Sequence, residues 1–302
     1  MNSIQNSKAS IFKNLELLTL FAFVGIVIFG GSNAVAVRFS NFDLPPFWGA
    51  ALRFGTAAVL FWVVTVMRGV QVPRGRALVG VVIYGALTVG ISYAFLYWAL
   101  QFIQASLTMV IGALGPLFTF FFALAHGQEN FRWKGLIGAL MAFGGILLGI
   151  GDQIGQVESL LPILAVVVGF AAASEGTVLY KSFPKSDPLA VNAISFTTGT
   201  VMLAVISLIA RETWRLPETQ EAWFAYGYLV LGGSFALFYL VLYVLNRWTA
   251  SATSYAFLLF PVVTIILGSW LANEVISGRF LLGAVIVLLG VWVGTIADPE
   301  NI

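Results

Sequence analysis

Two stretches of the sequence share one pattern: ASLTMVIGALGPLFTFF at residues 105–121 and ASATSYAFLLFPVVTII at residues 250–266. A displacement of 145 residues superimposes an Ala-Ser pair, a threonine and a proline, namely Ala105-Ser106 on Ala250-Ser251, Thr108 on Thr253 and Pro116 on Pro261. Chance rarely matches prolines in register within two apolar segments. The chain therefore contains an internal duplication.

The duplication extends outward from these stretches. The same displacement pairs an acidic residue and three glycines: Glu129 with Glu274, Gly138 with Gly283, Gly145 with Gly290 and Gly149 with Gly294. A displacement of 143 pairs Arg38 with Lys181 and Pro45 with Pro188, which places a length change of two residues between the blocks. We expect two repeats, over residues 1–151 and 152–302.

Composition places the chain in a lipid bilayer. Of its 302 residues 60% are apolar and 9% are charged, with a mean hydropathy of +0.96. Soluble domains carry about 25% charged residues. The apolar runs are about 20 residues long, as in membrane helices, and lack the alternation of barrel strands. The net charge of +2 is too small to indicate nucleic-acid binding, and the chain has no cysteine for disulfides, thiolate chemistry or metal ligation.

Ten apolar segments are long enough to span a membrane. They are residues 15–37, 45–67, 77–99, 104–125, 133–151, 160–180, 188–210, 222–246, 250–272 and 279–297. Each repeat contains five, and five is odd, so the second repeat enters the membrane in the opposite orientation. The predicted fold is an all-α integral membrane protein of two inverted five-helix repeats. Such repeats are typical of secondary transporters, which bind substrate between the repeats and expose it to alternate sides.

Charge predicts the orientation. With the N-terminus in the cytoplasm, ten Lys and Arg residues lie in cytoplasmic segments and four in external ones. The positive-inside rule then places both termini in the cytoplasm. The first apolar segment exceeds the length of a signal peptide, contains Glu16 and takes part in the repeat, so we interpret it as a retained helix.

The order of several short motifs resembles a known family. Gly31-Ser32-Asn33 is followed by Ala36 and Arg38, and Pro45 precedes Leu52-Arg53-Phe54; the duplicated block around Pro116 and Pro261 follows. This order resembles the EamA family of the drug/metabolite transporter superfamily. The resemblance implies a multi-pass transporter of the bacterial inner membrane that exports small metabolites. Among its members, the chain resembles the YddG-type amino-acid exporters.

Five polar or aromatic residues are candidates for contact with substrate: Asn33, Tyr93, Tyr97, Glu175 and Tyr239. Together they offer an acid for an ammonium group, amide and hydroxyl donors for a carboxylate, and ring faces for an apolar side chain. Each also has a structural interpretation. Asn33 can join helices, the tyrosines can form an interfacial belt, and Glu175 can pair with Lys181 near a helix end.

Three further residues are candidates for gating or structural roles. Arg53 lies inside the second segment, and buried ions are usually paired, here with carbonyl groups or with an acid such as Asp43. Pro116 and Pro261 lie in the middle of equivalent segments and remove backbone donors, so we expect both to kink their helices. His126, the only histidine, has no evident carboxylate partner and does not indicate a metal or catalytic site.

Other classes of protein fit less well. A membrane enzyme needs a nucleophile–base set or a metal cluster, and an ATP-driven pump needs a phosphate-binding loop; the sequence contains neither signature. A non-transporting scaffold remains an alternative. We therefore predict a transporter that is not an enzyme and uses no metal or cofactor. Its expected partners are a small-molecule substrate and the lipid bilayer, not nucleic acid, with proton coupling through an acid such as Glu175. The alternative substrates are other amphipathic metabolites or drugs.

Overall fold

The structure is a computed structural model that describes residues 2–150, 159–245, 247–248 and 250–296. Every regular element in these ranges is an α- or π-helix. Seven helices are long and apolar enough to cross a membrane, and three shorter apolar helices lie where the sequence predicts further spans. The predicted set of ten spans is therefore confirmed. The boundary expected between residues 151 and 152 falls outside the described residues.

The helices follow the ten predicted segments in order. The first five spans are α1 (Asn2–Gly31) with α2 (Asn33–Ser40), α3 (Pro46–Met67), α4 (Arg76–Gly85) with η1 (Ala86–Ile91) and α5 (Ser92–Ala99), α6 (Ala105–Gly112) with α7 (Gly115–Ala125), and α8 (Trp133–Ile150). The last five are α9 (Leu161–Tyr180), α10 (Pro188–Ile209), α11 (Gln220–Val230) with η2 (Leu231–Ala236) and α12 (Leu237–Leu245), α13 (Ala250–Leu271), and α14 (Gly278–Val291) with η3 (Trp292–Ile296).

The two prolines of the duplicated block act differently. Pro116 occupies the first turn of α7, directly after a break that separates α6 from α7. Proline is tolerated there because the first N–H groups of a helix have no partner within it. Pro261 instead lies inside α13, which continues through it. The chain is therefore interrupted before Pro116 but helical through Pro261, so the two prolines do not produce the matching kinks that the sequence predicts.

Element boundaries reproduce the duplication. Helices α6 and α13 begin at Ala105 and Ala250, and the π-helices η1 and η2 begin at Ala86 and Leu231, both 145 residues apart. Helices α3 and α10, however, begin at Pro46 and Pro188. The expected match of Pro45 with Pro188 is therefore wrong by one residue, because Pro45 precedes the helix and Pro46 opens it.

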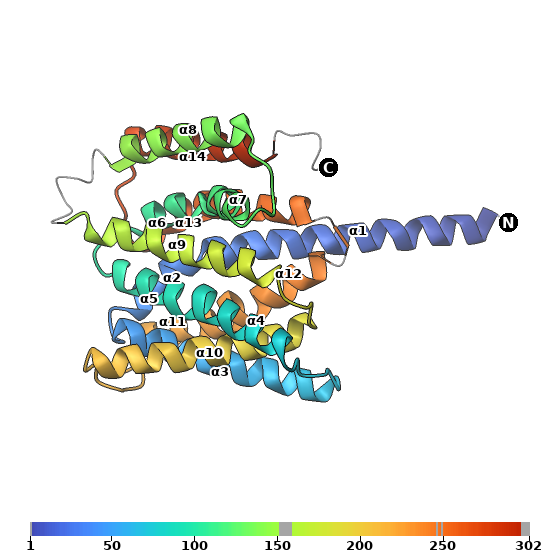
Figure 1. The fold of residues 1–302 in the computed structure, drawn as a ribbon, viewed down its shortest axis with the longest axis horizontal. Coiled ribbons are helices and arrows are strands. Elements are labelled where there is room, and N and C mark those ends of the chain that lie inside the picture. Colours follow the sequence, from blue (N-terminus) through green and yellow to red (C-terminus); the bar gives the residue numbers. More distant parts are fainter. Residues whose placement is uncertain (1, 151–158, 246, 249, 297–302) are drawn as a thin grey trace.

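Helices α8 and α14 pack through glycines that show how the repeats are related. A side chain on Gly138 would meet the Gly290 carbonyl at 2.4 Å, and one on Gly145 would meet the Gly283 carbonyl at 2.7 Å. Gly138 is equivalent to Gly283 and Gly145 to Gly290, so each glycine contacts the equivalent of the other. That reciprocal pattern is the mark of a two-fold axis. The axis passes between α8 and α14, which lie side by side as an outer layer of the molecule (Figure 1).

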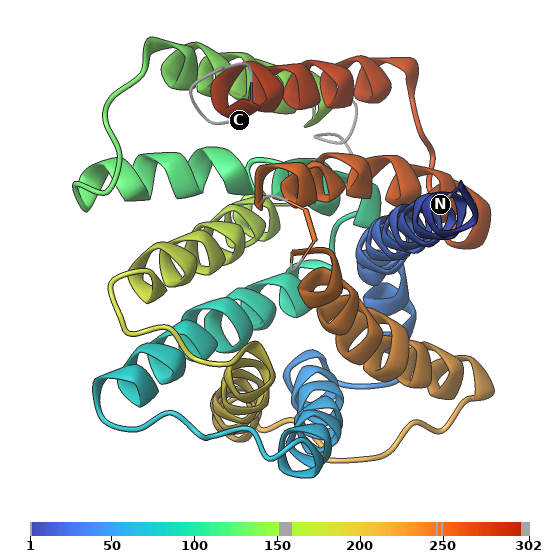
Figure 2. The same ribbon diagram turned by 90° about the vertical axis from the view of Figure 1, so that its right-hand side faces the viewer.

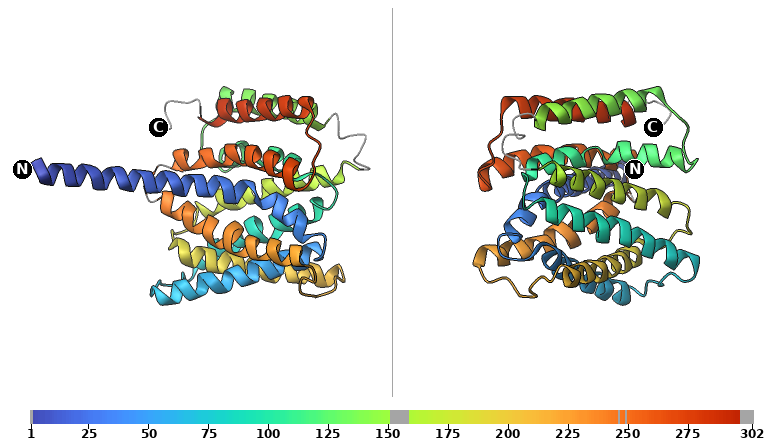
Figure 3. Two further views of the ribbon diagram at one scale, coloured as in Figure 1. Left: turned by 180° about the vertical axis from the view of Figure 1, so that it is seen from behind. Right: turned by 60° about the vertical axis from the view of Figure 1, so that its left-hand side comes forward.

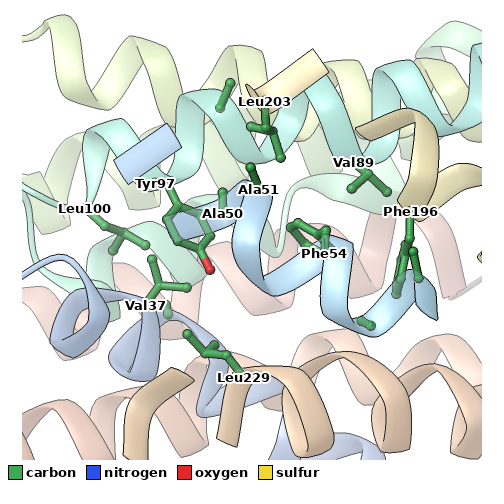
Figure 4. Close-up of a cluster of buried hydrophobic side chains, with 14 of the residues drawn as sticks. Val37, Ala50, Ala51, Phe54, Val89, Tyr97, Leu100, Phe196, Leu203 and Leu229 are labelled. Carbon is green, nitrogen blue, oxygen red and sulfur yellow. The ribbon is translucent and has the colours of Figure 1, made fainter. Parts of the chain in front are cut away.

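A second reciprocal pair closes the other side of the bundle. Helices α3 and α10 pack together on the side away from α8 and α14, as Figures 1 and 2 show. Their equivalent residues Phe54 and Phe196 contact each other, with ring centroids 5.2 Å apart. Both rings belong to the largest buried cluster, which also contains Tyr97 and Leu203 (Figure 4). This cluster lies between the repeats and holds the polar residues described below.

The bundle has two ends, which we name by residues that lie there. The Arg38 end contains the connections after α2, α5, α10 and α13; the His126 end contains those after α3, α7 and α9. The N-terminal part of α1 extends beyond the other helices (Figures 1 and 3).

The glycine contact predicts a position-specific effect on stability. Gly138→Ala should lower the free energy of unfolding by about 1–3 kcal/mol, because its methyl group would force α8 away from α14. Gly144→Ala on the same helix is the matched control, since no atom lies within 4 Å of its added methyl group. Thermal unfolding in detergent compares them, and equal midpoints for the two variants would contradict close packing at Gly138.

Candidate substrate site

Arg53 is a fully buried cation at the centre of the bundle. It lies on α3 with 0% of its surface exposed. Its guanidinium donates to Ser234 Oγ at 2.9 Å, to the Gly233 carbonyl at 2.9 Å and to the Tyr97 hydroxyl at 3.2 Å. All three acceptors are neutral. The positive charge is solvated by dipoles from α5 and η2 rather than balanced by an opposite charge.

The π-helix η2 makes one of these acceptors available. In a π-helix the backbone bonds are shifted from the regular α-helical pattern, so carbonyl groups are freed for side-chain donors, and such turns recur at functional sites. The Gly233 carbonyl accepts from Arg53 and also from Asn33 Nδ2 at 3.0 Å. Glycine at this position lets both side chains approach the carbonyl, since a Cβ would lie 3.0 Å from Asn33 Oδ1 and 3.3 Å from Arg53 Nη2, closer than ordinary van der Waals contact.

Asn33 and two aromatic rings complete the arrangement. Asn33 Oδ1 is buried without a hydrogen-bond partner, which leaves an acceptor for a donor group of a ligand. The Arg53 guanidinium carbon lies 4.7 Å from the centroid of the Phe54 ring and 5.4 Å from that of Tyr93. Ring faces attract cations and pack well against apolar groups. We call Asn33, Arg53, Tyr93, Tyr97 and Ser234 the Arg53 cluster.

The acid suggested as a partner for Arg53 lies elsewhere. Among the residues that the structure describes, no carboxylate forms an ion pair with Arg53. Asp43 instead lies at the Arg38 end, where Oδ2 accepts from the backbone N–H of Glu218 at 2.6 Å and of Thr219 at 3.0 Å. The pairing of Arg53 with Asp43 is therefore wrong, whereas the alternative partner, a carbonyl, is present.

These bonds affect the titration of Asp43. The backbone N–H groups of Thr219 and Glu218 hold the pKa of the Asp43 carboxyl below its ordinary value, outweighing the opposite effect of burial, and the charge of Arg215 adds to the lowering. Asp43 thus joins the α2–α3 connection to the α10–α11 connection, one from each repeat.

Glu175 lies outside the Arg53 cluster. It sits on α9, and its Oε1 pairs with His126 Nε2 at 2.7 Å near the His126 end. The expected pairing with Lys181 is replaced by this contact, and the expectation that His126 lacks a carboxylate partner is wrong. Residues 126 and 175 belong to different repeats, so linear sequence gave no signal of their proximity.

Tyr239 is also separate from the cluster. It lies on α12 with 38% of its surface exposed, which is typical of a residue at the lipid-facing side. The structure therefore brings together Asn33, Arg53, Tyr93 and Tyr97 from the predicted residues. It adds Ser234 and the Gly233 carbonyl, whose only sequence signal is the run of small residues at 232–234 within an aromatic span.

The Arg53 cluster draws residues from both repeats but has no symmetry-related copy. The register of α3 and α10 makes Arg53 equivalent to Ser195, and the register of η1 and η2 makes Ser234 equivalent to Val89. The same register makes Tyr93 equivalent to Phe238. The symmetry-related positions therefore carry neither the cation nor the hydroxyl group of Ser234. The fold therefore does not require this cluster, which points to a functional role.

Comparison with known proteins defines the class. The sequence profile of the EamA-like transporter family matches residues 17–150 and 160–295, one match for each repeat. The chain therefore belongs to the EamA-like transporter family, and with it to the drug/metabolite transporter superfamily. The protein is a multi-pass membrane transporter.

Particular relatives agree with that class. The chain is 27% identical to the "Uncharacterized inner membrane transporter YedA" of Escherichia coli (strain K12), over 80% of this chain and 79% of the relative. It is 26% identical to the "Uncharacterized transporter YyaM" of Bacillus subtilis (strain 168), over 61% and 63% of the two chains. One solved structure, entitled "Crystal structure of protein", aligns with a TM-score of 0.67 and 21% identity over 93% of this chain and 98% of that one, which shows the fold alone.

The Asp43 contacts predict a pH-dependent difference in stability. Asp43→Asn should lower the free energy of unfolding by about 1–2 kcal/mol at pH 7, because it removes the charge that accepts two backbone N–H groups. A carboxyl group whose pKa is lowered by folding stabilises the folded state at pH values above its unfolded-state pKa of about 3.9. This stabilisation is lost as the pH falls through the folded-state pKa. The difference between wild type and variant should therefore vanish in strong acid.

Thermal unfolding across pH measures this difference. Glu218→Gln is the control, since its carboxylate pairs with Arg215 at 3.1 Å while exposed to solvent, and exposed pairs contribute little. A difference between wild type and Asp43→Asn that is independent of pH would rule out the carboxylate as its source.

Proposed function

We propose that this transporter exports amino acids, including aromatic ones, by alternating access between its two repeats. The observation that carries the proposal is the buried Arg53 guanidinium, solvated only by neutral groups and placed beside aromatic rings at the repeat interface. A buried cation without a counter-charge is costly in a membrane, and such residues mark substrate pathways.

Each group of an amino acid finds a complementary partner in the cluster. The planar guanidinium suits a carboxylate, which it can bind through two parallel hydrogen bonds once it releases neutral acceptors. The unpartnered Asn33 Oδ1 can accept from an ammonium group. The Phe54 and Tyr93 faces suit an apolar or aromatic side chain. Substrate recognition therefore centres on a cation, in place of the acid expected from Glu175.

A phosphorylated substrate fits less well. Phosphate groups are usually held by several converging cations, and Arg53 is the one cation among the buried residues that the structure describes. Other amphipathic carboxylates or drugs are the alternative, since ring contacts discriminate weakly between side chains. Transport competition separates these classes.

Access to Arg53 requires movement of the repeats. The side chain is enclosed in this conformation, so substrate reaches it when the helices around it separate. We propose that residues 1–151 and 152–302 move as the two units, with both termini in the cytoplasm and the protein in the bacterial inner membrane. The charge bias and the YedA relative support this placement. Outward transport is part of the proposal and follows from the resemblance of the sequence motifs to YddG-type exporters.

The first prediction of this proposal concerns the substrate carboxylate. In proteoliposomes, Arg53→Gln should reduce uptake of labelled phenylalanine at least about tenfold, since a charge-assisted hydrogen bond is worth about 1.5–3 kcal/mol. Unlabelled phenylalanine should compete in the wild type, whereas phenylalaninamide, which lacks the carboxylate, should compete at least about tenfold less well.

Two controls sharpen the result. Arg68→Gln removes a cation from the exposed end of the same helix and should leave uptake unchanged. Competition by phosphorylated metabolites but not by amino acids would overturn the assignment of substrate class. Equal competition by phenylalanine and its amide would show that Arg53 does not bind a carboxylate.

We also propose that His126 and Glu175 exchange the coupling proton. They form an imidazole–carboxylate pair that meets across the repeats at 2.7 Å, and both side chains are partly accessible to solvent. A proton entering this pair changes a contact between α7 and α9. Because His126 and Glu175 belong to different repeats, protonation of the pair alters the relative stability of the positions that the repeats adopt.

The corresponding prediction separates coupling from binding. Glu175→Gln should remove the stimulation of transport by a pH gradient while substrate exchange without a gradient persists, because Arg53 is untouched. Glu16→Gln, on an acid at an exposed position of α1, is the matched control. Unchanged dependence on the pH gradient in Glu175→Gln would assign the pair a structural role.

A further inference from the structure

Glu274 joins three parts of the molecule at the Arg38 end. Its side chain is almost completely buried, and Oε1 accepts from Arg38 Nη1 at 2.8 Å and from the Ala105 N–H at 2.7 Å. Its Oε2 accepts from the Ser106 N–H at 3.1 Å and from Ser106 Oγ at 2.6 Å. We call these four residues the Glu274 latch.

The latch is strong for physical reasons. The first N–H groups of α6 have no partner within the helix, and the helix dipole concentrates positive potential there. A carboxylate held by these groups and by an arginine is the favourable arrangement for a buried acid. Glu274 belongs to the second repeat, whereas Arg38, Ala105 and Ser106 belong to the first. The latch therefore holds the repeats together at this end.

The acid of the latch and the start of the helix that it binds are duplicated in the sequence. Glu274 is equivalent to Glu129 and Ala105-Ser106 to Ala250-Ser251, at a displacement of 145 residues. Both acids lie four residues before the next helix, α8 or α14, and both Ala-Ser pairs open a helix, α6 or α13. The duplicated components all belong to the opposite, His126 end of the bundle.

In the part of the chain that the structure describes, Glu129 does not take part in an equivalent latch. Glu129 is 38% exposed and pairs with Arg132, three residues away, at 3.3 Å. Inverted repeats exchange conformations as the transporter changes the side to which it opens. A contact that holds one end closed is then reproduced by the equivalent residues at the other end when that end closes.

We infer that Glu274 and Glu129 are alternating latches for the two ends of the transport pathway. In the conformation seen here Glu274 holds the Arg38 end closed. In the opposite conformation Glu274 releases α6, and Glu129 binds the first backbone N–H groups of α13. This inference rests on the alternating-access part of the proposed function and not on the identity of the substrate.

A second carboxylate at the Arg38 end, that of Glu212, also binds backbone N–H groups of the other repeat but is not duplicated in the sequence. We call this contact the Glu212 clamp. Glu212 accepts from the N–H groups of Phe47 at 3.2 Å and Trp48 at 2.8 Å, again across the repeats. The register of α3 and α10 makes Glu212 equivalent to Val70, which cannot accept such bonds. Of these two carboxylates that clamp backbone N–H groups across the Arg38 end, Glu274 has an acidic equivalent and Glu212 does not.

The absence of cysteine from the chain allows a direct test. Ser40→Cys places a single thiol at the Arg38 end, at a position that is 1% exposed. Its rate of reaction with a water-soluble maleimide reports how often this end opens. Purified protein in lipid nanodiscs exposes both ends to the reagent, so the measurement depends neither on orientation nor on substrate.

Opposite effects are expected from the two acids. In the Ser40→Cys background, Glu274→Gln should raise the reaction rate about tenfold, since loss of about 1.4 kcal/mol from the closed state shifts the equilibrium by that factor. Glu129→Gln should lower the rate, because it weakens only the state in which the Arg38 end is open. The double variant should lie between them. Glu218→Gln, an exposed acid at the same end, should leave the rate unchanged.

Each result decides the matter. A rise in rate in Glu129→Gln would show general loosening and overturn the inference, as would an unchanged rate in that variant. If Glu274→Gln does not fold, as judged by size-exclusion chromatography, the direction of change in Glu129→Gln decides alone, since its carboxylate is exposed here. Failure of amino-acid transport with these labelling results intact would reject the substrate and retain the latches.

Discussion

Every buried backbone group inside a membrane needs a hydrogen-bond partner within the protein. At the candidate substrate site this requirement applies to the Gly233 carbonyl, which accepts from two side chains. Regular helices satisfy the rule by themselves, which is why the described chain is helical. At η2 the pattern shifts, and Arg53 and Asn33 supply donors from α3 and α2. The interruption thus fixes three helices around one oxygen atom. It also holds a positive charge at a depth where water cannot stabilise it.

Much of the fold is predictable from the sequence because apolar length and repetition are local signals. The ten spans and their duplication follow from run length and from landmarks such as Pro116 and Pro261. The limits of local signals are equally physical. Pro45 and Pro46 are adjacent, and the sequence does not indicate which of them is the first residue of α3. Pro261 is accommodated inside α13, which the sequence does not distinguish from the break before Pro116.

The site is less predictable, since its contacts join residues far apart in the chain. Asn33, Arg53, Tyr93 and Tyr97 are recognisable as polar or aromatic residues within apolar spans. The acceptor shared by Asn33 and Arg53 is the main-chain carbonyl of Gly233, which no side-chain pattern indicates. The contact of Glu175 with His126 likewise crosses the repeats. Once the register of the helices is known, comparison of the repeats supplies the missing signal: shared residues maintain the architecture, and residues present in one repeat only identify the site.

The clamp made by Glu212, which has no counterpart in the other repeat, has a consequence for the energetics of the alternating-access cycle proposed above. Together with Trp48, whose ring stacks on Trp214 at 4.4 Å, it adds stability to closure of one end only. The two access states therefore differ in free energy before any ligand binds. A ligand that needs the rarer state has an apparent dissociation constant raised in inverse proportion to the population of that state. The same binding site thus has a lower apparent affinity for substrate that arrives from the side that the clamp closes. Rebinding from that compartment is disfavoured, although the residues that contact the substrate are the same.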